Sequence, residues 1–289
     1  MLAPNPLPVD SFENLRSRVE RLLRARERKD ITDLSLPLVA GLSKNFGKEI
    51  VYPTRSIGNF LDFLADSNPL GEVYLFGGIL RDLALLGRRG FNSDIDIVVE
   101  GHWSHCVRYL KSLGAKQNRF GGFRLPVAEW SIDIWNAEET WAIRNQHIAY
   151  RGIASLTQTT VLNWDAILMD WRTKRFVARP EYLSEIHERI LDIVLIQNPN
   201  PLGMAVRVFR HLCLKDARKI TPRAAMYLAD ATERYSFDLI QSDEIRSYGK
   251  SLIHKPVYDL FRLVRSEGNI PIGEKFGIAA ETLRRELDL

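Results

Sequence analysis

The sequence contains little cysteine and no long apolar run. Its two cysteines, Cys106 and Cys213, are far apart and do not have the spacing of metal ligands. This excludes a disulfide framework and a cysteine zinc site, and favours two buried, small apolar side chains. No apolar stretch approaches the roughly 20 residues that a transmembrane helix needs. The first residues also lack the basic and apolar regions of a signal peptide, so we expect a cytoplasmic protein with no membrane partner.

A strong excess of charge of one sign is also missing. The 289 residues include 40 Lys and Arg against 36 Asp and Glu, a formal net charge of +4. This balance permits a nucleic acid partner without requiring one. With 45% hydrophobic residues and neither internal repeats nor low-complexity tracts, the chain is not disordered or fibrous. At about 100–200 residues per domain, we expect one large or two ordinary domains.

An amphipathic helix is predicted near the N-terminus, with Ser11 as its N-cap. Apolar residues recur there at helical spacing, at Phe12, Leu15, Val19 and Leu22. The opposite face mixes arginine with glutamate, which predicts a solvated surface with ion pairs. The alternative is a basic arm that contacts a nucleic acid backbone. Residues 1–55 are expected to form a helical arm.

The middle of the chain alternates between strand and helix patterns. A helix over 56–65 is followed by predicted strands over 73–76, 95–99, 122–127 and 129–135, with helices over 79–86 and 102–113. A helix around 138–144 and strands over 161–171 and 175–178 follow. This order predicts an α/β (α+β) fold on a small mixed sheet, covering residues 56–180.

From Pro180 onward the pattern is helical. We expect helices through Ile186–Val194, Met204–Leu214 and Tyr227–Tyr235, and then over 243–268 and 271–287. Residues 181–289 are therefore predicted to form a helical domain.

Three features of the α/β part carry chemistry. Gly77 and Gly78 stand where a strand turns into a helix, and such a turn presents free N–H groups to a phosphate; the alternative is an ordinary turn. Asp94 and Asp96 open the next strand on one face, where two carboxylates favour a divalent metal; the alternative is a pair of solvated side chains. Asp133 is a lone carboxylate in an apolar strand, which is unfavourable unless it is paired or binds metal. Its alternative is a satisfied residue at a sheet edge.

Together these features resemble the nucleotidyltransferase superfamily that includes DNA polymerase beta. The segment from Gly77 to Arg88 reads Gly-Gly-Ile-Leu-Arg-Asp-Leu-Ala-Leu-Leu-Gly-Arg, and Asp94-Ile95-Asp96 follows it. This resembles the head-domain motif of the poly(A) polymerase and CCA-adding enzyme branch. Val161-Leu162-Asn163 is similar to that branch's Phe-Thr-Ile-Asn-Ala segment.

The branch also carries Glu-Asp-x-x-Arg-x-x-Arg in a helical neck. Arg207 and Arg210 match its two arginines, but Gly203 and Met204 replace the acidic pair. In CCA-adding enzymes that Asp and Arg act as a protein template for choosing CTP and ATP. The replacement argues against templated CCA addition.

The resemblance implies a nucleotidyltransferase head with N-terminal helices and a C-terminal helical neck domain. It implies transfer of a nucleoside monophosphate from a nucleoside triphosphate to a hydroxyl, with two Mg²⁺ or Mn²⁺ ions. Asp94, Asp96 and Asp133 would be the catalytic residues and the metal ligands. The expected nucleotide-binding residues are Gly77, Gly78, Arg81, Arg88, Asn163, Arg207 and Arg210. For each arginine the alternative is a structural or solvated residue.

The acceptor is left open by the sequence. We expect template-independent transfer to an RNA 3′ end, such as that of a tRNA-like molecule. The alternatives are an oligonucleotide or nucleotide signal, a protein acceptor or a small molecule, as in a toxin or an antiphage defence component with a partner protein. An inactive fold used as a binding module is the third alternative.

Overall fold

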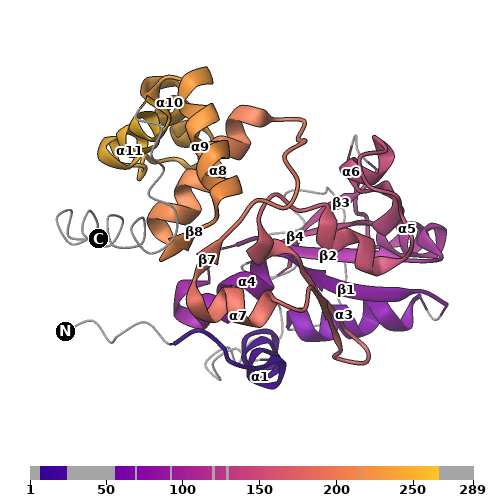
Figure 1. Cartoon of the computed structure of the whole chain (residues 1–289). Coiled ribbons are helices and arrows are strands. Elements are labelled where there is room, and N and C mark those ends of the chain that lie inside the picture. Colours follow the sequence, from indigo (N-terminus) through magenta and orange to yellow (C-terminus); the bar gives the residue numbers. More distant parts are fainter. Residues whose placement is uncertain are drawn as a thin grey trace, which may run out of the picture. The chain divides into compact units, whose positions relative to one another are not determined.

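The computed structural model describes residues 7–24, 56–68, 70–91, 93–118, 121–127, 130–215 and 217–266. The chain divides into two compact units (Figure 1). The first contains Met1–Thr159 and Asp165–Arg179, and the second contains Thr160–Trp164 and Pro180–Leu289. The helix expected over 271–287 and most of the expected N-terminal arm lie outside the described residues.

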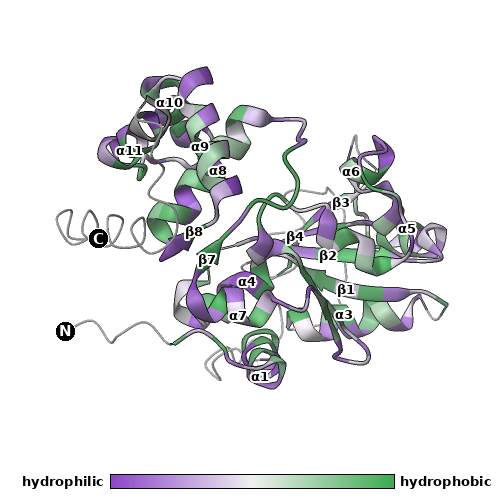
Figure 2. Ribbon diagram, viewed as in Figure 1, coloured by the Kyte–Doolittle hydropathy of each residue, from purple (hydrophilic) through white to green (hydrophobic). Residues whose placement is uncertain are grey.

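The first unit is built on a six-stranded mixed sheet. Its strands are β1 (Glu72–Phe76), β2 (Ile95–Glu100), β3 (Phe123–Val127), β4 (Trp130–Asn136), β5 (Ile167–Asp170) and β6 (Phe176–Ala178), in the order β3-β4-β2-β1-β5-β6. β2 and β4 pair in parallel, and the other neighbours pair antiparallel. Apolar residues run along the central strands β1 and β2 (Figure 2). The predicted α/β fold with a small mixed sheet is confirmed.

Helices α3 (Ile57–Asp66), α4 (Gly78–Leu85) and α5 (Trp103–Ser112) contact the central strands of this sheet. The N-cap of α3 is Ser56, whose side chain accepts a hydrogen bond from the Asn59 N–H. None of the described helices is long and apolar enough to cross a membrane.

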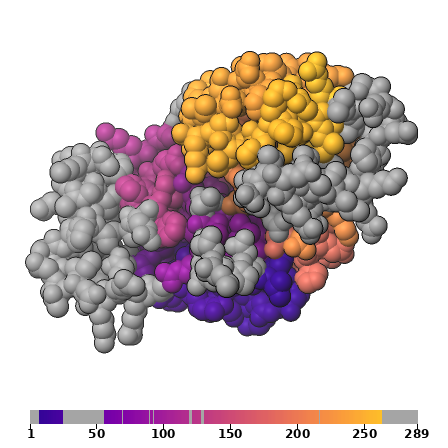
Figure 3. All heavy atoms as spheres, turned by 90° about the vertical axis from the view of Figure 1, so that its left-hand side faces the viewer, coloured from indigo at the N-terminus to yellow at the C-terminus, as the bar shows by residue number. Residues whose placement is uncertain are grey.

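Helix α1 (Phe12–Leu23) packs against α4. Its N-cap is Ser11, as predicted, and its buried stripe ends at Leu23 rather than at the predicted Leu22. Arg18 on this helix donates to the carbonyl oxygen of Leu83 at 2.8 Å. The outer side of α1 lies on the surface of the unit (Figure 3). Arg18 therefore has a structural role, which leaves fewer arginines of the helix for contact with a nucleic acid backbone.

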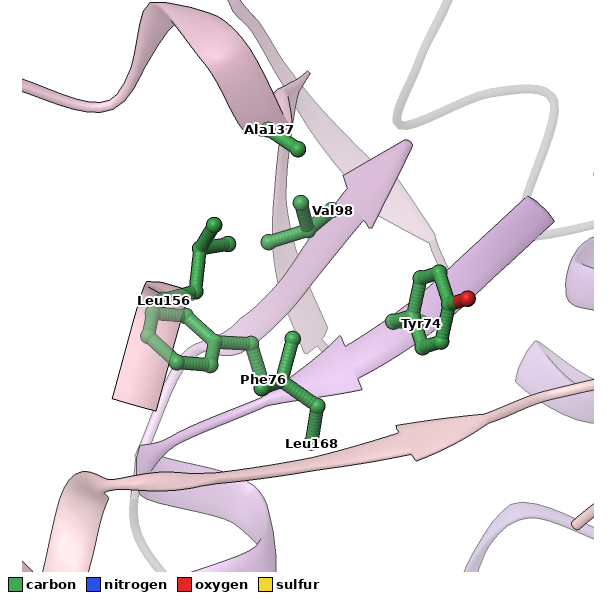
Figure 4. Packing of buried hydrophobic residues seen from close by; sticks show 6 residues of the cluster. All are labelled: Tyr74, Phe76, Val98, Ala137, Leu156 and Leu168. Atoms are coloured by element: carbon green, nitrogen blue, oxygen red, sulfur yellow. The ribbon is translucent and has the colours of Figure 1, made fainter. Parts of the chain in front are cut away.

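One face of the sheet carries a buried apolar cluster: Tyr74, Phe76, Val98, Ala137, Leu156 and Leu168 (Figure 4). The chain that follows β4 supplies the covering residues through η2 (Ala137–Glu139), α6 (Trp141–Arg144) and η3 (Ile153–Gln158). This segment replaces the single helix that the sequence predicted around 138–144.

The backbone conformation corrects two of the predicted elements. The strand expected over 161–171 is mostly absent, because Asn163–Asp165 forms a 3₁₀ turn (η4) and only Ile167–Asp170 is a strand. The helix expected through Ile186–Val194 is α7 (Tyr182–Glu188), which ends at Arg189 in the left-handed region with a φ of 58°. Apolar residues at helical spacing continued past this end.

The described residues of the second unit form helices and a short strand pair. Its main helices are α8 (Pro201–Leu214), α9 (Pro222–Arg234), α10 (Phe237–Tyr248) and α11 (Lys255–Ser266), and β7 (Ile190–Leu191) pairs in parallel with β8 (Lys219–Ile220). The helix expected over 243–268 is interrupted, because Gly249 adopts a φ of 76° and caps α10. The two short strands were not predicted, since two residues carry no periodic signal.

Candidate active site

Strand register places two of the predicted carboxylates side by side. The parallel pair β2 and β4 aligns Asp96 with Asp133, and the antiparallel pair β1 and β2 aligns Phe76 with Asp96. Residues paired in register point to the same face of a sheet, and so do residues two positions apart. Asp94 therefore shares the face of Asp96 and Asp133. The three carboxylates are therefore directed to one face of the sheet near the start of β2.

The glycine turn lies at the same end of the sheet, because β1 ends at Phe76 beside Asp96. Gly77 has a φ of 63°, and its N–H donates to the Ile167 carbonyl oxygen at 3.0 Å. Helix α4 starts at Gly78 without a side-chain cap, so its first N–H groups have no partner within the helix. A Cβ at Gly78 would lie 3.1 Å from the Ser93 side chain, so only glycine fits there without a shift. This arrangement is typical of turns that bind anions.

Arg124 on β3 is a site residue that the sequence analysis missed. Its Nη2 donates to Asp94 Oδ2 at 2.5 Å, and its Nε lies 3.6 Å from Asp133 Oδ1. The same Nε donates to Ser131 Oγ at 2.9 Å. The register pairs Arg124 directly with Asp133. The register of the hairpin formed by β3 and β4, had it been predicted, would have identified this pair, but no local motif marks Arg124.

The charges around Asp133 act in opposite directions on its pKa. Burial raises the pKa of Asp133, the positive charge of Arg124 lowers it, and the negative charge of Asp94 raises it, with a net increase. The guanidinium of Arg124 thus offsets part of the increase in the pKa of Asp133.

Arg81, a predicted phosphate-binding residue, is buried in a hydrogen-bonded network. Its guanidinium donates to Asp82 Oδ1 at 2.9 Å, to Ser93 Oγ at 2.7 Å and to Asp165 Oδ1. Ser93 Oγ in turn donates to Asp82 Oδ2 at 2.7 Å. Only 3% of Arg81 is exposed. The network ties the start of α4 to the residue before Asp94, and it would have to open before Arg81 could bind a phosphate.

The other predicted nucleotide-binding residues are divided between the two units. Arg88 is exposed at the start of η1 (Arg88–Gly90) in the first unit, and Arg207 is exposed on α8 in the second. Asn163, also in the second unit, is fully buried; its Nδ2 donates to Glu185 and to the Ile190 carbonyl oxygen, and its Oδ1 accepts from the Asp192 N–H. These bonds engage both the nitrogen and the oxygen of the Asn163 amide.

Arg210 has a structural environment in the second unit. It forms an ion pair with Glu244, which is fully buried, and its guanidinium lies 4.0 Å from the centroid of the Tyr248 ring. Arg210 therefore compensates a buried charge between α8 and α10.

The donor chemistry of the carboxylate site fits a hard divalent cation, because three aspartate side chains supply oxygen ligands. In the described part of the chain, however, no group of three or more His, Cys, Asp or Glu side chains is already arranged to hold a metal ion. Asp94 and Asp133 instead share the guanidinium of Arg124. Metal binding at this site would require that guanidinium to move.

No protein-family model matches the chain, and no curated protein matches it. Solved structures with a similar fold do exist. A tRNA nucleotidyltransferase complexed with a primer tRNA and an incoming ATP analog has a TM-score of 0.51 and 14% identity, and the match covers 71% of this chain and 61% of that chain. A tRNA-processing enzyme has a TM-score of 0.50 and 15% identity, with 71% and 56% covered. The CCA-adding enzyme of Thermotoga maritima, complexed with tRNA, has a TM-score of 0.49 and 20% identity, with 78% and 53% covered.

The chain spans little more than half the length of these neighbours. At such identities the likeness concerns the fold, and it rests on the first two structures. At that level it agrees with the resemblance that the motifs predicted. The chain has the fold of the tRNA nucleotidyltransferases.

Proposed function

We propose that this protein is a metal-dependent nucleotidyltransferase that transfers a nucleoside monophosphate from a nucleoside triphosphate to a hydroxyl acceptor. The observation that carries the proposal is the register of three strands. Phe76, Asp96 and Asp133 stand side by side on β1, β2 and β4, so the glycine turn and the carboxylates share one end of the sheet. A triphosphate held at the turn would have its reacting phosphate near acidic ligands.

In this proposal Asp94, Asp96 and Asp133 hold two Mg²⁺ or Mn²⁺ ions. When bound, such ions neutralise charge on the attacking and leaving oxygens. The free N–H groups at Gly78 and after it bind the terminal phosphates, and the exposed Arg88 is available to add positive charge. The hydrogen-bonded network of Arg81 holds this turn in position relative to Asp94 at the start of β2.

We also propose an RNA 3′ end as the acceptor and the cytoplasm as the location. The fold supports this choice, since one neighbour is complexed with a primer tRNA and an ATP analog. Gly203 and Met204 stand at the start of α8 where the resembling neck carries its acidic pair, so we do not expect templated CCA addition. The proposed parts are a helical arm over 1–55, a catalytic head over 56–180 and a helical domain over 181–289.

Incubation with each labelled nucleoside triphosphate tests the proposal. The protein is supplied with Mg²⁺ or Mn²⁺, with and without tRNA, and the destination of the label is followed. Label in tRNA is expected. Asp94→Asn should abolish the transfer, whereas Asp66→Asn should not, because Asp66 is an exposed residue at the end of α3.

Other outcomes change the conclusion in defined ways. Label in the protein itself or in free oligonucleotides would overturn the RNA acceptor and support a signalling or protein-modifying enzyme. No incorporation under any condition would overturn nucleotidyl transfer and favour a binding module. Unchanged turnover in Asp94→Asn would show that the carboxylates are not the active site.

A further inference from the structure

Arg124 occupies the position at which the carboxylate site needs a positive charge. From strand β3, which pairs with β4, its Nη2 lies 2.5 Å from Asp94 Oδ2 and its Nε lies 3.6 Å from Asp133 Oδ1. The Arg124 side chain is 58% exposed, and Asp94 and Asp133 are 52% and 30% exposed. The guanidinium therefore lies in an accessible site where water and ions can reach it.

The three groups depend on one another electrostatically. Two carboxylates on one face repel each other unless a cation lies between them. Arg124 supplies that cation from within the chain, and Ser131 Oγ accepts a second hydrogen bond from its Nε at 2.9 Å. A divalent ion bound to the same oxygens would repel the guanidinium. The two cations therefore exclude each other.

We infer that Arg124 is a resident counter-ion of the carboxylate site, and that it competes with the divalent cation for Asp94 and Asp133. This inference rests on the proposed function of that site. Loading of the site then requires the Arg124 side chain to leave both carboxylates. Its high exposure makes such a movement compatible with an unchanged fold. Arg124 thereby sets the concentration of divalent cation at which the site fills.

Mn²⁺ binding to the full chain, measured by the loss of the free-ion electron paramagnetic resonance signal without nucleotide, tests the inference. Arg124→Gln removes the competing charge, and we expect it to bind Mn²⁺ about fivefold more tightly than the unmodified protein, as for loss of a half-exposed ion pair. Arg124→Lys keeps the charge and should remain close to the unmodified protein. Arg108→Gln is the control for net charge, because Arg108 is exposed on α5.

The thermal midpoint gives a second readout. Without metal, Arg124→Gln should melt below the unmodified protein because Asp94 and Asp133 lose their counter-ion. Added Mn²⁺ should raise its midpoint more than that of the unmodified protein. Circular dichroism before heating checks that the variant has the same fold.

Three results would overturn the inference. The first is unchanged or weaker Mn²⁺ binding in Arg124→Gln. The second and third are an increase in Mn²⁺ affinity in Arg124→Lys or in Arg108→Gln that equals the increase in Arg124→Gln. Asp94→Asn separates this failure from failure of the proposed function. If Asp94→Asn loses Mn²⁺ binding while Arg124→Gln is unchanged, the carboxylates are the metal site and only the role of Arg124 is wrong. If Asp94→Asn binds Mn²⁺ normally, the proposed metal site and the inference fail together.

Discussion

The buried guanidinium of Arg81 donates a hydrogen bond to the carboxylate of Asp165, which lies 84 positions later in the chain. The two side chains are 4% and 7% exposed, and Asp82, the second carboxylate on Arg81, is fully buried. The neighbouring negative charges raise the pKa of Arg81, so the group stays charged in spite of its burial. The pair connects the start of α4 to the segment that leads into β5.

Arg81→Met should therefore destabilise the first unit strongly. The substitution leaves Asp82 and Asp165 buried without their counter-charge, which costs about 3–5 kcal/mol in the free energy of unfolding. Urea unfolding measures the change. Arg144→Met is the matched control, because the ion pair of Arg144 with Glu139 is about half exposed and should contribute at most about 1 kcal/mol. Equal losses in the two variants would show that the Arg81 network is not stabilising.

Gly77→Ala is predicted to affect both stability and triphosphate binding. Gly77 has a φ of 63° and a ψ of −114°, a combination that L residues rarely adopt, so alanine should cost about 1–3 kcal/mol. Gly152, with a φ of 107° and no atom near its would-be Cβ, is a control with similar backbone strain away from the turn. Both variants should lose stability, but only Gly77→Ala should raise the KM for the nucleotide. A similar KM increase in Gly152→Ala would show that the increase in Gly77→Ala results from general destabilisation and not from a change at the turn.

Local sequence patterns were sufficient for two helix starts and for the face that two carboxylates share. Ser11 and Ser56 cap α1 and α3, and the period of two residues extends the face of Asp96 on β2 to Asp94, which directly precedes the strand. These features depend on neighbouring residues alone, so they can be read without knowledge of the fold. The role of the carboxylates is a proposal that the Asp94→Asn variant tests.

The environments of the arginines depend on contacts distant in the chain. Arg124 meets Asp94 through the pairing of β4 with both β3 and β2, and Arg81 meets Asp165 through the pairing of β1 with β5. The hairpin of β3 and β4 joins strands adjacent in the sequence, but the other two pairings have no local pattern. The sequence could therefore supply candidate cations for a phosphate, but it could not separate a buried structural arginine from an exposed one.

Lys174 gives a prediction for the pH dependence of stability. Burial and the nearby charge of Arg24 lower the pKa of Lys174 to about 8, and its Nζ lies 3.1 Å from the centroid of the Trp171 ring. Because the ordinary value is 10.5, the unfolded chain binds more protons than the folded chain between these two pKa values. The contribution of Lys174 to stability therefore increases as the pH rises through this range.

Lys174→Met should remove this increase. Urea unfolding at about pH 7.5 and about pH 9.5 is compared for the two proteins, and the difference in their pH dependence isolates Lys174. The variant should be relatively more stable at the lower pH, where the native lysine carries an unfavourable partly buried charge. A difference between the proteins that does not change with pH would contradict the lowered pKa.

Arg207 and Arg210 should respond differently to substitution, although both match the arginines of the neck motif. Arg210 pairs with Glu244, whose carboxylate also accepts the N–H groups of Leu252 and Ile253. Arg210→Met leaves Glu244 buried without its cation and should cost about 3 kcal/mol or more in the free energy of unfolding. Arg207 is exposed on α8, so Arg207→Met should change stability by at most about 0.5 kcal/mol.

Urea unfolding and nucleotide affinity are measured on both variants, because a weaker affinity in Arg207→Met at unchanged stability would identify Arg207 as a phosphate-binding residue. An equally small loss of stability in Arg210→Met would contradict a structural role for its ion pair with Glu244.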